Sequence, residues 1–302
     1  METLEALSER LHTTEEIQSI VRTMKALSSV NIRQYEHAVT AIAGYERAIT
    51  LGLQVVLRNR RNKAEPLGLA PEDREAGHRR ALIVVGSDRG LCGRFNDRIA
   101  EFASKRLDAE ETPTDEEEPF VCAVGIRAAA RLEALDLPAN RVFTLPGSVD
   151  GLIDTVQAIV VDIDRWVREE GVGPVALVCN RKSDHTLAEA THKELLPVSK
   201  AYLDGLAAAP WPSNRLPMYR MEEGELFSWL IRQHLFLILY AALAESLASE
   251  HASRLAAMQN AERNIDERRE NLLADFRKKR QETITHELLE VVAGFEAIRK
   301  KR

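Results

Sequence analysis

Cysteine is scarce in this chain, which argues against a disulfide-stabilised scaffold and against a zinc-binding protein. The sequence has 302 residues but only three cysteines, Cys92, Cys122 and Cys179, an odd number without a closely spaced pair. Zinc sites need such pairs, and a disulfide framework needs an even number of cysteines. We therefore expect three buried thiols in a reducing compartment and no metal site.

Positive charge is in deficit, and long apolar runs are missing. Lys and Arg number 41 against 47 Asp and Glu, so the net charge is −6. Binding to nucleic acid would require a basic face. We therefore expect no nucleic-acid partner. The longest apolar candidate, residues 235–243, is too short to span a bilayer, which takes about 20 residues. The acidic residues 1–5 do not have the pattern of a targeting leader, so any membrane association is expected to be indirect, through other subunits.

Proline is absent from two long segments at the ends of the chain, residues 3–58 and 222–298. At 1.5 Å per residue each segment would form a helix about 80 to 110 Å long, which is too long to fold into one compact domain. In the first segment apolar residues recur at spacings of three and four, as in a coiled-coil seam, and in the second segment apolar residues lie on one helix face. The seam residues are Tyr35, Ala38, Ile42, Tyr45, Ile49, Gly52 and Val56 in the first segment, and Leu255, Met258, Ile265, Leu272, Phe276, Ile284, Leu288, Val291, Phe295 and Ile298 in the second.

The middle of the chain has an α/β pattern. Short apolar runs closed by glycine, residues 81–86 and 120–125, indicate strands that are covered on both faces. Helical patterns follow each of them, and residues 142–145 and 175–179 continue the alternation. This order predicts a small, mostly parallel, Rossmann-like sheet with helices on both sides, and residues 191–198 are a candidate edge strand.

The predicted fold class is therefore α/β plus a long antiparallel coiled coil, in which the terminal helices form a two-helix rod. We expect an N-terminal coiled-coil helix over residues 1–58 and a linker over residues 59–80. An α/β foot domain over residues 81–218 and a C-terminal coiled-coil helix over residues 219–302 complete the chain.

One glycine-rich turn, residues 86–93, follows a strand and precedes a helix, where α/β folds often bind phosphate. Its glycines do not match the dinucleotide fingerprint, and no Lys-Ser or Lys-Thr follows as in a phosphate loop. We interpret it as a tight turn whose shape is fixed by Asp88 and Arg89. The eight histidines are scattered, so we expect no catalytic, cofactor-binding or metal-binding residues.

The arms also carry unusual polar stretches. Residues 262–270 are polar almost all round, which indicates a solvated helix or a contact with a wet surface. Arg22, Lys25 and Arg33 lie along the first arm, and residues 277–280 form a dense cationic band on the second. Such bands suit weak, exchangeable contacts with acidic loops of a partner.

Four stretches together resemble the gamma subunit of F-type ATP synthases, the central stalk of a rotary motor. They are residues 17–26 (IQSIVRTMKA), residues 87–93 (SDRGLCG) followed by Asn96, residues 245–251 (ESLASEH) followed by Arg254 and Met258, and residues 280–290 (RQETITHELLE). The resemblance covers nearly the whole chain in order. The opening residues and residues 32–36 are similar to the N-type branch, for which sodium translocation is the family expectation.

The resemblance implies a non-catalytic rotor inside a ring of three alpha and three beta subunits. The foot would rest on a membrane ring of c subunits beside epsilon, at the cytoplasmic face of the bacterial inner membrane. It implies that Met24 and Lys25 lie near an acidic lever of beta, while Arg280, Gln281, Thr285 and Glu287 form a catch. Glu250 and Arg254 would act in rotor coupling, and Ile298 would enter an apolar collar.

Three other interpretations remain open from the residues alone. The first is a coiled-coil adaptor outside any ATPase, with an α/β ligand-binding domain. The second is an α/β enzyme with a helical handle, and the third is the stalk subunit of a V-type motor, which is expected to lack an α/β block of this size. The coupling ion, proton or sodium, is left open because the ion sites belong to the c subunits.

Overall fold

The computed structural model describes residues 3–62, 79–109, 118–183, 186–214 and 217–300, with side chains except those of Asn62, Ala109 and residues 294–300. Its contacts divide the chain into two compact units. Unit 1 comprises residues 1–28 and 255–302, and unit 2 comprises residues 29–254. The first and last helices each contribute to both units.

The first arm forms two helices, α1 (Leu4–Ala41) and α2 (Ala43–Asn62), rather than the one uninterrupted helix that the proline-free sequence predicts. The break falls at Ile42. Just before it, the Thr40 hydroxyl donates to the carbonyl of His37 at 2.8 Å, and Gly44 follows two residues later. Such back-bonding bends helices, and glycine weakens a helix interior.

Unit 2 is built on a five-stranded sheet in the order β3-β2-β1-β4-β5. Its strands are β1 (Arg79–Val85), β2 (Phe120–Val124), β3 (Arg141–Phe143), β4 (Val172–Arg181) and β5 (Glu189–Leu196). The first four are mutually parallel, and β5 pairs antiparallel with β4 at the edge. The predicted, mostly parallel sheet is confirmed, with β5 as its edge strand.

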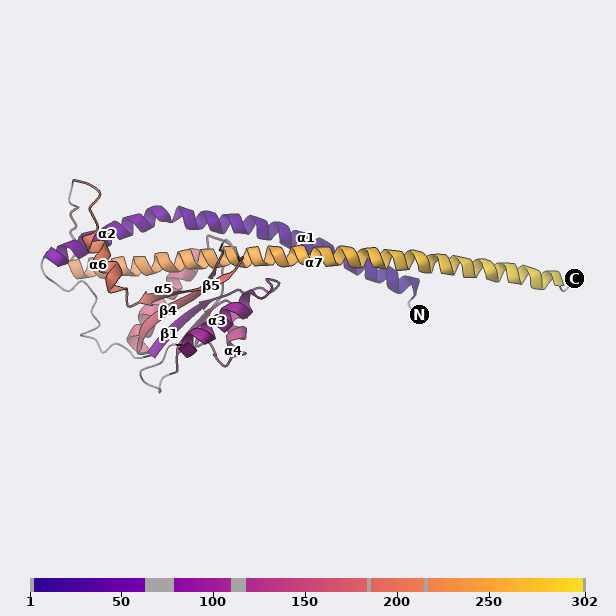
Figure 1. Cartoon of the computed structure of the whole chain (residues 1–302), viewed down its shortest axis with the longest axis horizontal. Coiled ribbons are helices and arrows are strands. Elements are labelled where there is room, and N and C mark those ends of the chain that lie inside the picture. The colour runs from indigo at the N-terminus through magenta and orange to yellow at the C-terminus, as the bar shows by residue number, and fades with distance from the viewer. Residues whose placement is uncertain (1–2, 63–78, 110–117, 184–185, 215–216, 301–302) are drawn as a thin grey trace. The chain divides into compact units, whose positions relative to one another are not determined.

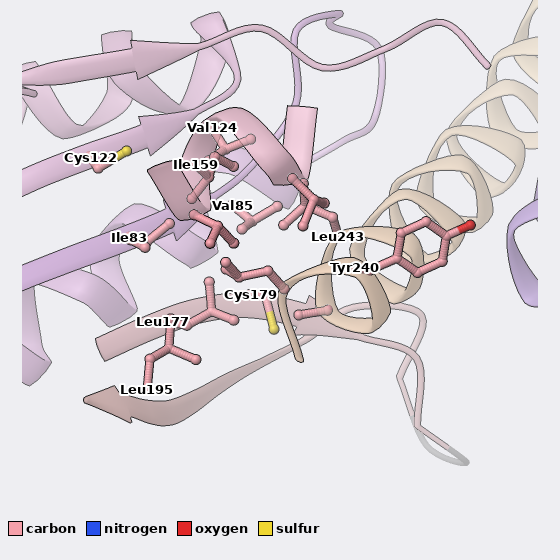
Figure 2. Packing of buried hydrophobic residues seen from close by; sticks show 14 of the residues in the cluster. Ile83, Val85, Cys122, Val124, Ile159, Leu177, Cys179, Leu195, Tyr240 and Leu243 are labelled. Carbon is pink, nitrogen blue, oxygen red and sulfur yellow. The ribbon is translucent and has the colours of Figure 1, made fainter. Parts of the chain in front are cut away.

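Helices cover both faces of this sheet (Figure 1). They are α3 (Phe95–Ala109), α4 (Ile126–Glu133), α5 (Leu152–Glu169) and part of α7 (Glu223–Lys300), whereas α6 (Lys200–Ala208) packs on α2. The alternation of β1 explains the layers: Leu82 and Val84 pack under α3 and α4, whereas Ala81, Ile83 and Val85 pack under α5 and α7. Figure 2 shows the second cluster, in which Tyr240 and Leu243 of α7 lie over the sheet.

A third cluster joins α2, α6 and the start of α7. Leu53 and Leu57 of α2, Leu203 of α6 and Phe227 of α7 are all buried in it. The sequence does not predict helix α6, because its two buried side chains, Leu203 and Ala207, give only a short apolar pattern. Its position is set by packing against α2, which lies about 150 residues earlier in the sequence.

The predicted seam of the first arm is mostly correct. Tyr35, Ala38, Ile49 and Val56 are buried, while Tyr45 is exposed. The Tyr45 hydroxyl instead donates to Gln233 at 2.9 Å. Contacts within unit 2 pair α1 and α2 with α7 in antiparallel order, since partners of later residues in the first arm lie earlier in α7.

Unit 1 contains the beginning of α1 and the rest of α7, again antiparallel. Few apolar side chains are buried in it: Leu7, Val21, Met258 and Leu272. Polar residues of α1 fill much of the remaining seam, namely Thr14, Gln18 and Ser28. The predicted seam therefore holds at Met258 and Leu272 but fails at Ile284, Leu288 and Val291, which are exposed. The side chains of Phe295 and Ile298 lie outside the described residues.

Among the described residues, one helix, α7, is long and apolar enough in composition to cross a membrane, and half of its most apolar window is buried. The sequence does not predict such a stretch, because polar residues interrupt the apolar runs of α7. Leu235, Leu239 and Leu243 of this helix belong to the core of unit 2, so packing on the sheet accounts for this apolar character.

Candidate functional site

The turn after β1 is held by a buried hydrogen-bond network. The Asn96 side chain accepts from the backbone N–H of Ser87 at 2.9 Å and donates to the Ser87 hydroxyl at 2.8 Å. That hydroxyl donates to the carbonyl of Arg89 at 2.9 Å. Ser87 and Asn96 are both buried, so the start of α3 fixes the turn from within.

Asp88 fixes the same turn from the other side. Its two carboxylate oxygens accept from the backbone N–H groups of Ile126 at 2.8 Å and Leu145 at 2.7 Å. Gly125, just before Ile126, has a φ of 117°, and a Cβ there would lie 2.8 Å from the Ser87 backbone. The predicted role of Asp88 in shaping the turn is confirmed, whereas Arg89 contributes its carbonyl and leaves its side chain exposed.

Arg254 of α7 docks on this turn. Its side chain is 5% exposed and forms an ion pair with Glu250, which is 6% exposed, one helical turn earlier. The same guanidinium donates to the carbonyls of Gly90 and Arg89, each at 3.3 Å. Burial raises the pKa of Glu250, and the charge of Arg254 opposes that rise. The two residues that the sequence assigns to rotor coupling are therefore brought together, and they connect α7 to the sheet.

His251 extends this contact to α1. Its ring lies 3.3 Å, nitrogen to nitrogen, from both the Arg254 guanidinium and the Asn31 amide. Tyr35 of α1 stacks on it, with ring centroids 5.8 Å apart and planes 13° from parallel. The sequence does not assign Asn31, Tyr35 or His251 to a site, because residues about 220 positions apart give no local pattern. The position of His251 inside the matched stretch of residues 245–251 is the available signal.

A cavity of about 460 Å³ adjoins the turn. Arg127 and Arg131 of α4 line it together with Asn96 and Asp97 of α3, and Arg131 is paired with Asp97 at 2.8 Å. Across the part of the chain that the structure describes, His, Cys, Asp and Glu form no group able to hold a metal ion.

The N-terminal group of predicted residues lies in unit 1. Lys25 of α1 forms an ion pair with Glu262 of α7, and Arg22 reaches the same carboxylate at 3.3 Å. The hydrogen bond from Lys25 is the main cause of the lowered pKa of Glu262. Gln18 also donates to Asp266. Residues 262–270 are thus only partly a solvated helix, because Glu262 and Asp266 face α1, whereas Glu267 and Glu270 are exposed.

The C-terminal group is exposed. Arg280, Gln281, Thr285 and Glu287 all lie on the outside of α7 in unit 1, and the Thr285 hydroxyl makes a local contact with the Gln281 carbonyl at 2.8 Å. Large apolar side chains on the same stretch are 47% to 68% exposed: Ile284, Leu288, Leu289, Val291 and Val292. This stretch therefore presents both charge and apolar surface.

Comparison with known proteins covers the whole chain. The sequence model of a family described as ATP synthase matches residues 3–298. The ATP synthase gamma chain of Geotalea uraniireducens is 26% identical over 99% of this chain and its own full length. That of Salinibacter ruber is 27% identical, with 99% of each chain covered.

Solved structures show the same fold. A chain of the Euglena gracilis mitochondrial ATP synthase in rotational state 3 has a TM-score of 0.62 at 18% identity, covering 98% of this chain and 94% of its own. A chain of the central stalk and c-ring of the Tetrahymena thermophila enzyme has a TM-score of 0.55 at 21% identity, covering 80% and 99%. The family model, the relatives and the fold agree with the resemblance of the four sequence stretches. The chain therefore belongs to the ATP synthase family and is a gamma chain, the non-catalytic central-stalk subunit of the F-type enzyme.

Proposed function

We propose that this chain rotates within a ring of three alpha and three beta subunits and couples their ATP chemistry to ion flow through a membrane ring of c subunits. Epsilon would accompany the foot. The chain would be a peripheral component at the cytoplasmic face of the bacterial inner membrane, held there by the c ring. The names of the relatives support this assembly. The similar Euglena gracilis chain was solved together with F1 and the c-ring, which also supports it.

The observation that carries the proposal is the exposed end of α7. In unit 1, α7 continues past the N-terminal end of α1 (Figure 1), and its large apolar side chains from Ile284 to Val292 are left without cover in the described part of the chain. Apolar side chains of this size lose roughly 1.5 to 3 kcal/mol each when they stay in water. A surrounding apolar sleeve from partner subunits would remove that loss.

The two-helix pair of unit 1 has unlike sides. One side of α1 near Lys25 carries the ion pairs to Glu262, whereas Ile20 and Leu27 on α1 are exposed. A pair without threefold symmetry cannot make the same contacts with three identical beta subunits. Each catalytic site would then be held in a different state, and rotation would exchange those states through differential contact energy.

The roles of individual residues follow from their positions. Met24 is half-buried beside Lys25, and Lys25 keeps 30% of its side chain exposed despite its ion pair, which leaves it accessible to an acidic loop of beta. Arg280, Gln281, Thr285 and Glu287 would form the catch on the exposed part of α7. Glu250 and Arg254 would transmit torque from α7 to the foot through the turn after β1.

The test is a paired variant in a reconstituted complex with alpha and beta subunits. Arg280→Glu combined with Gln281→Leu should leave assembly intact and lower ATP turnover severalfold, because both side chains lie on the outer surface of α7 rather than in its core. Lys105→Glu, at an exposed position of α3 in the α/β foot, is the matched charge-reversal control and should keep near-normal turnover. Normal turnover of the paired variant would contradict the assignment of Arg280 and Gln281 to the catch.

A further inference from the structure

The contacts of His251 fix its protonation state. Its Nδ1 lies 3.3 Å from Nη1 of Arg254. A guanidinium has donors and no acceptor, so Nδ1 must accept this hydrogen bond and carry no proton. A doubly protonated ring would place an N–H against an N–H and one positive charge against another.

A neutral ring without a proton on Nδ1 has its proton on Nε2. This Nε2 lies 3.3 Å from the side-chain amide of Asn31, and it must donate to that amide. Asn31 therefore has to present its oxygen, Oδ1, to the ring. Oxygen and nitrogen of an amide exchange places by a half-turn of the group with almost no change in shape, and only the hydrogen-bond network distinguishes them.

The groups around the ring favour the same state. Arg254 faces it from α7, Asn31 and Tyr35 from α1, and Arg89 from the turn after β1. Burial, followed by the charges of Arg254 and Arg89, lowers the pKa of His251 to about 4. The ring is therefore neutral throughout the neutral pH range.

The geometry points to His251 as a positioning residue that joins Asn31 of α1 to Arg254 of α7, with its single proton on Nε2. Through this relay, α1 helps to hold the Arg254 guanidinium on the carbonyls of Arg89 and Gly90, so that both long helices and the sheet move as one body at this level. The part of this inference that concerns torque rests on the proposed function, whereas the protonation state does not.

The protonation state is tested on the full chain with ¹⁵N-labelled histidine. The His251 signals are identified as those missing from a His251→Gln variant. At pH 7 we expect Nε2 to resonate as a protonated nitrogen and Nδ1 as an unprotonated one, coupled across the hydrogen bond to Arg254. A proton on Nδ1, or on both nitrogens, would overturn the assignment.

The positioning role is tested in the assembled complex by ions transported per ATP hydrolysed, read in sealed vesicles. His251→Asn keeps an acceptor for Arg254, His251→Gln keeps a donor for Asn31, and Asn31→Leu removes the far end of the relay. Because the relay needs both ends, each variant should lower the ratio at least twofold. Asn31→Leu combined with His251→Gln should lower it no further than either change alone. Additive losses, or a normal ratio in all three, would contradict the relay.

Measurements of stability and assembly distinguish loss of the relay from misfolding and from failure to assemble. Asn31 lies on a half-buried face of α1, so Asn31→Leu tests the relay even if substitution of His251 prevents folding. A wild-type chain that does not assemble with alpha and beta subunits would overturn the proposed function but leave the protonation state in place. A relay defect would instead appear in complexes that assemble normally.

Discussion

Gly52 of α2 and Leu230 of α7 pack so closely that a Cβ on Gly52 would lie 2.8 Å from Cδ2 of Leu230. A Cβ at this position would force the buried Leu230 side chain to move. Gly44, in the first turn of α2, has nothing within 4 Å of such a Cβ, although both glycines lie in one helix.

This contrast predicts opposite effects of one substitution. Gly52→Ala should destabilise the protein by about 1 to 3 kcal/mol, because the added methyl overpacks the contact with Leu230. Gly44→Ala should stabilise it by about 0.5 to 1 kcal/mol through helix propensity alone. Urea unfolding of the two variants measures both. Equal changes would mean that α2 and α7 are not packed at Gly52.

Asp88 should matter more for stability than its partly exposed position suggests. Asp88→Ala removes the acceptors of two backbone N–H groups, those of Ile126 and Leu145, and a loss of about 2 kcal/mol is expected. Asp204→Ala, at an exposed position of α6, is the control and should change stability by less than about 0.5 kcal/mol. Thermal or denaturant unfolding distinguishes the two variants, and equal losses would show that Asp88 does not hold the turn.

His251 should make stability depend on pH in a defined window. Its folded pKa of about 4 lies below its ordinary value of 6.5, so its contribution is present above pH 6.5 and is lost as the pH falls toward 4. At roughly 1.4 kcal/mol per pKa unit, the loss across this window is on the order of 2 to 3 kcal/mol. Glu250 acts in the opposite direction, because its raised pKa favours the folded state at low pH.

The His251→Gln variant isolates the histidine contribution, since Glu250 remains in both proteins. The stability difference between wild type and variant should shrink as the pH is lowered from 6.5 to 4. A difference that stays constant across this window would show that His251 is not held neutral in the folded protein.

The three cysteines should be unreactive in the folded protein. Cys92, Cys122 and Cys179 are all buried and free, and burial raises the pKa of each thiol. Because the thiolate is the reacting form, a thiol reagent at pH 8 should modify all three in denaturant and none in the native chain over the same time. Rapid native labelling of Cys92 would show that the turn after β1 opens.

The sequence predicts the parts of the fold that rest on local apolar patterns. The run 81–85 predicts a doubly covered strand, and the structure divides its side chains between two clusters. The break at Ile42 could not be predicted from the absence of proline, because it depends on the Thr40 hydroxyl and on Gly44 together. Helix α6 depends on distant packing against α2, which no local pattern contains.

In the candidate site, too, the sequence predicts local contacts but not those between distant segments. Glu250 and Arg254 are assigned from a matched stretch, and their pairing is visible at the spacing of one helical turn. The relay through His251 to Asn31 and the pairing of Lys25 with Glu262 depend on which faces of α1 and α7 meet. Those faces follow from the register of two helices more than 200 residues apart in sequence, which periodicity alone does not set.

The proposed function requires an asymmetric helix pair to impose different states on three identical catalytic subunits. Electron cryomicroscopy of this chain assembled with alpha and beta subunits would resolve those states. We expect three different beta conformations, with the exposed stretch of α7 from Arg280 to Val292 enclosed by the ring and contacting each beta subunit differently. Equivalent beta subunits around an ordered chain, or a ring that assembles with this stretch of α7 left in solvent, would be incompatible with that function.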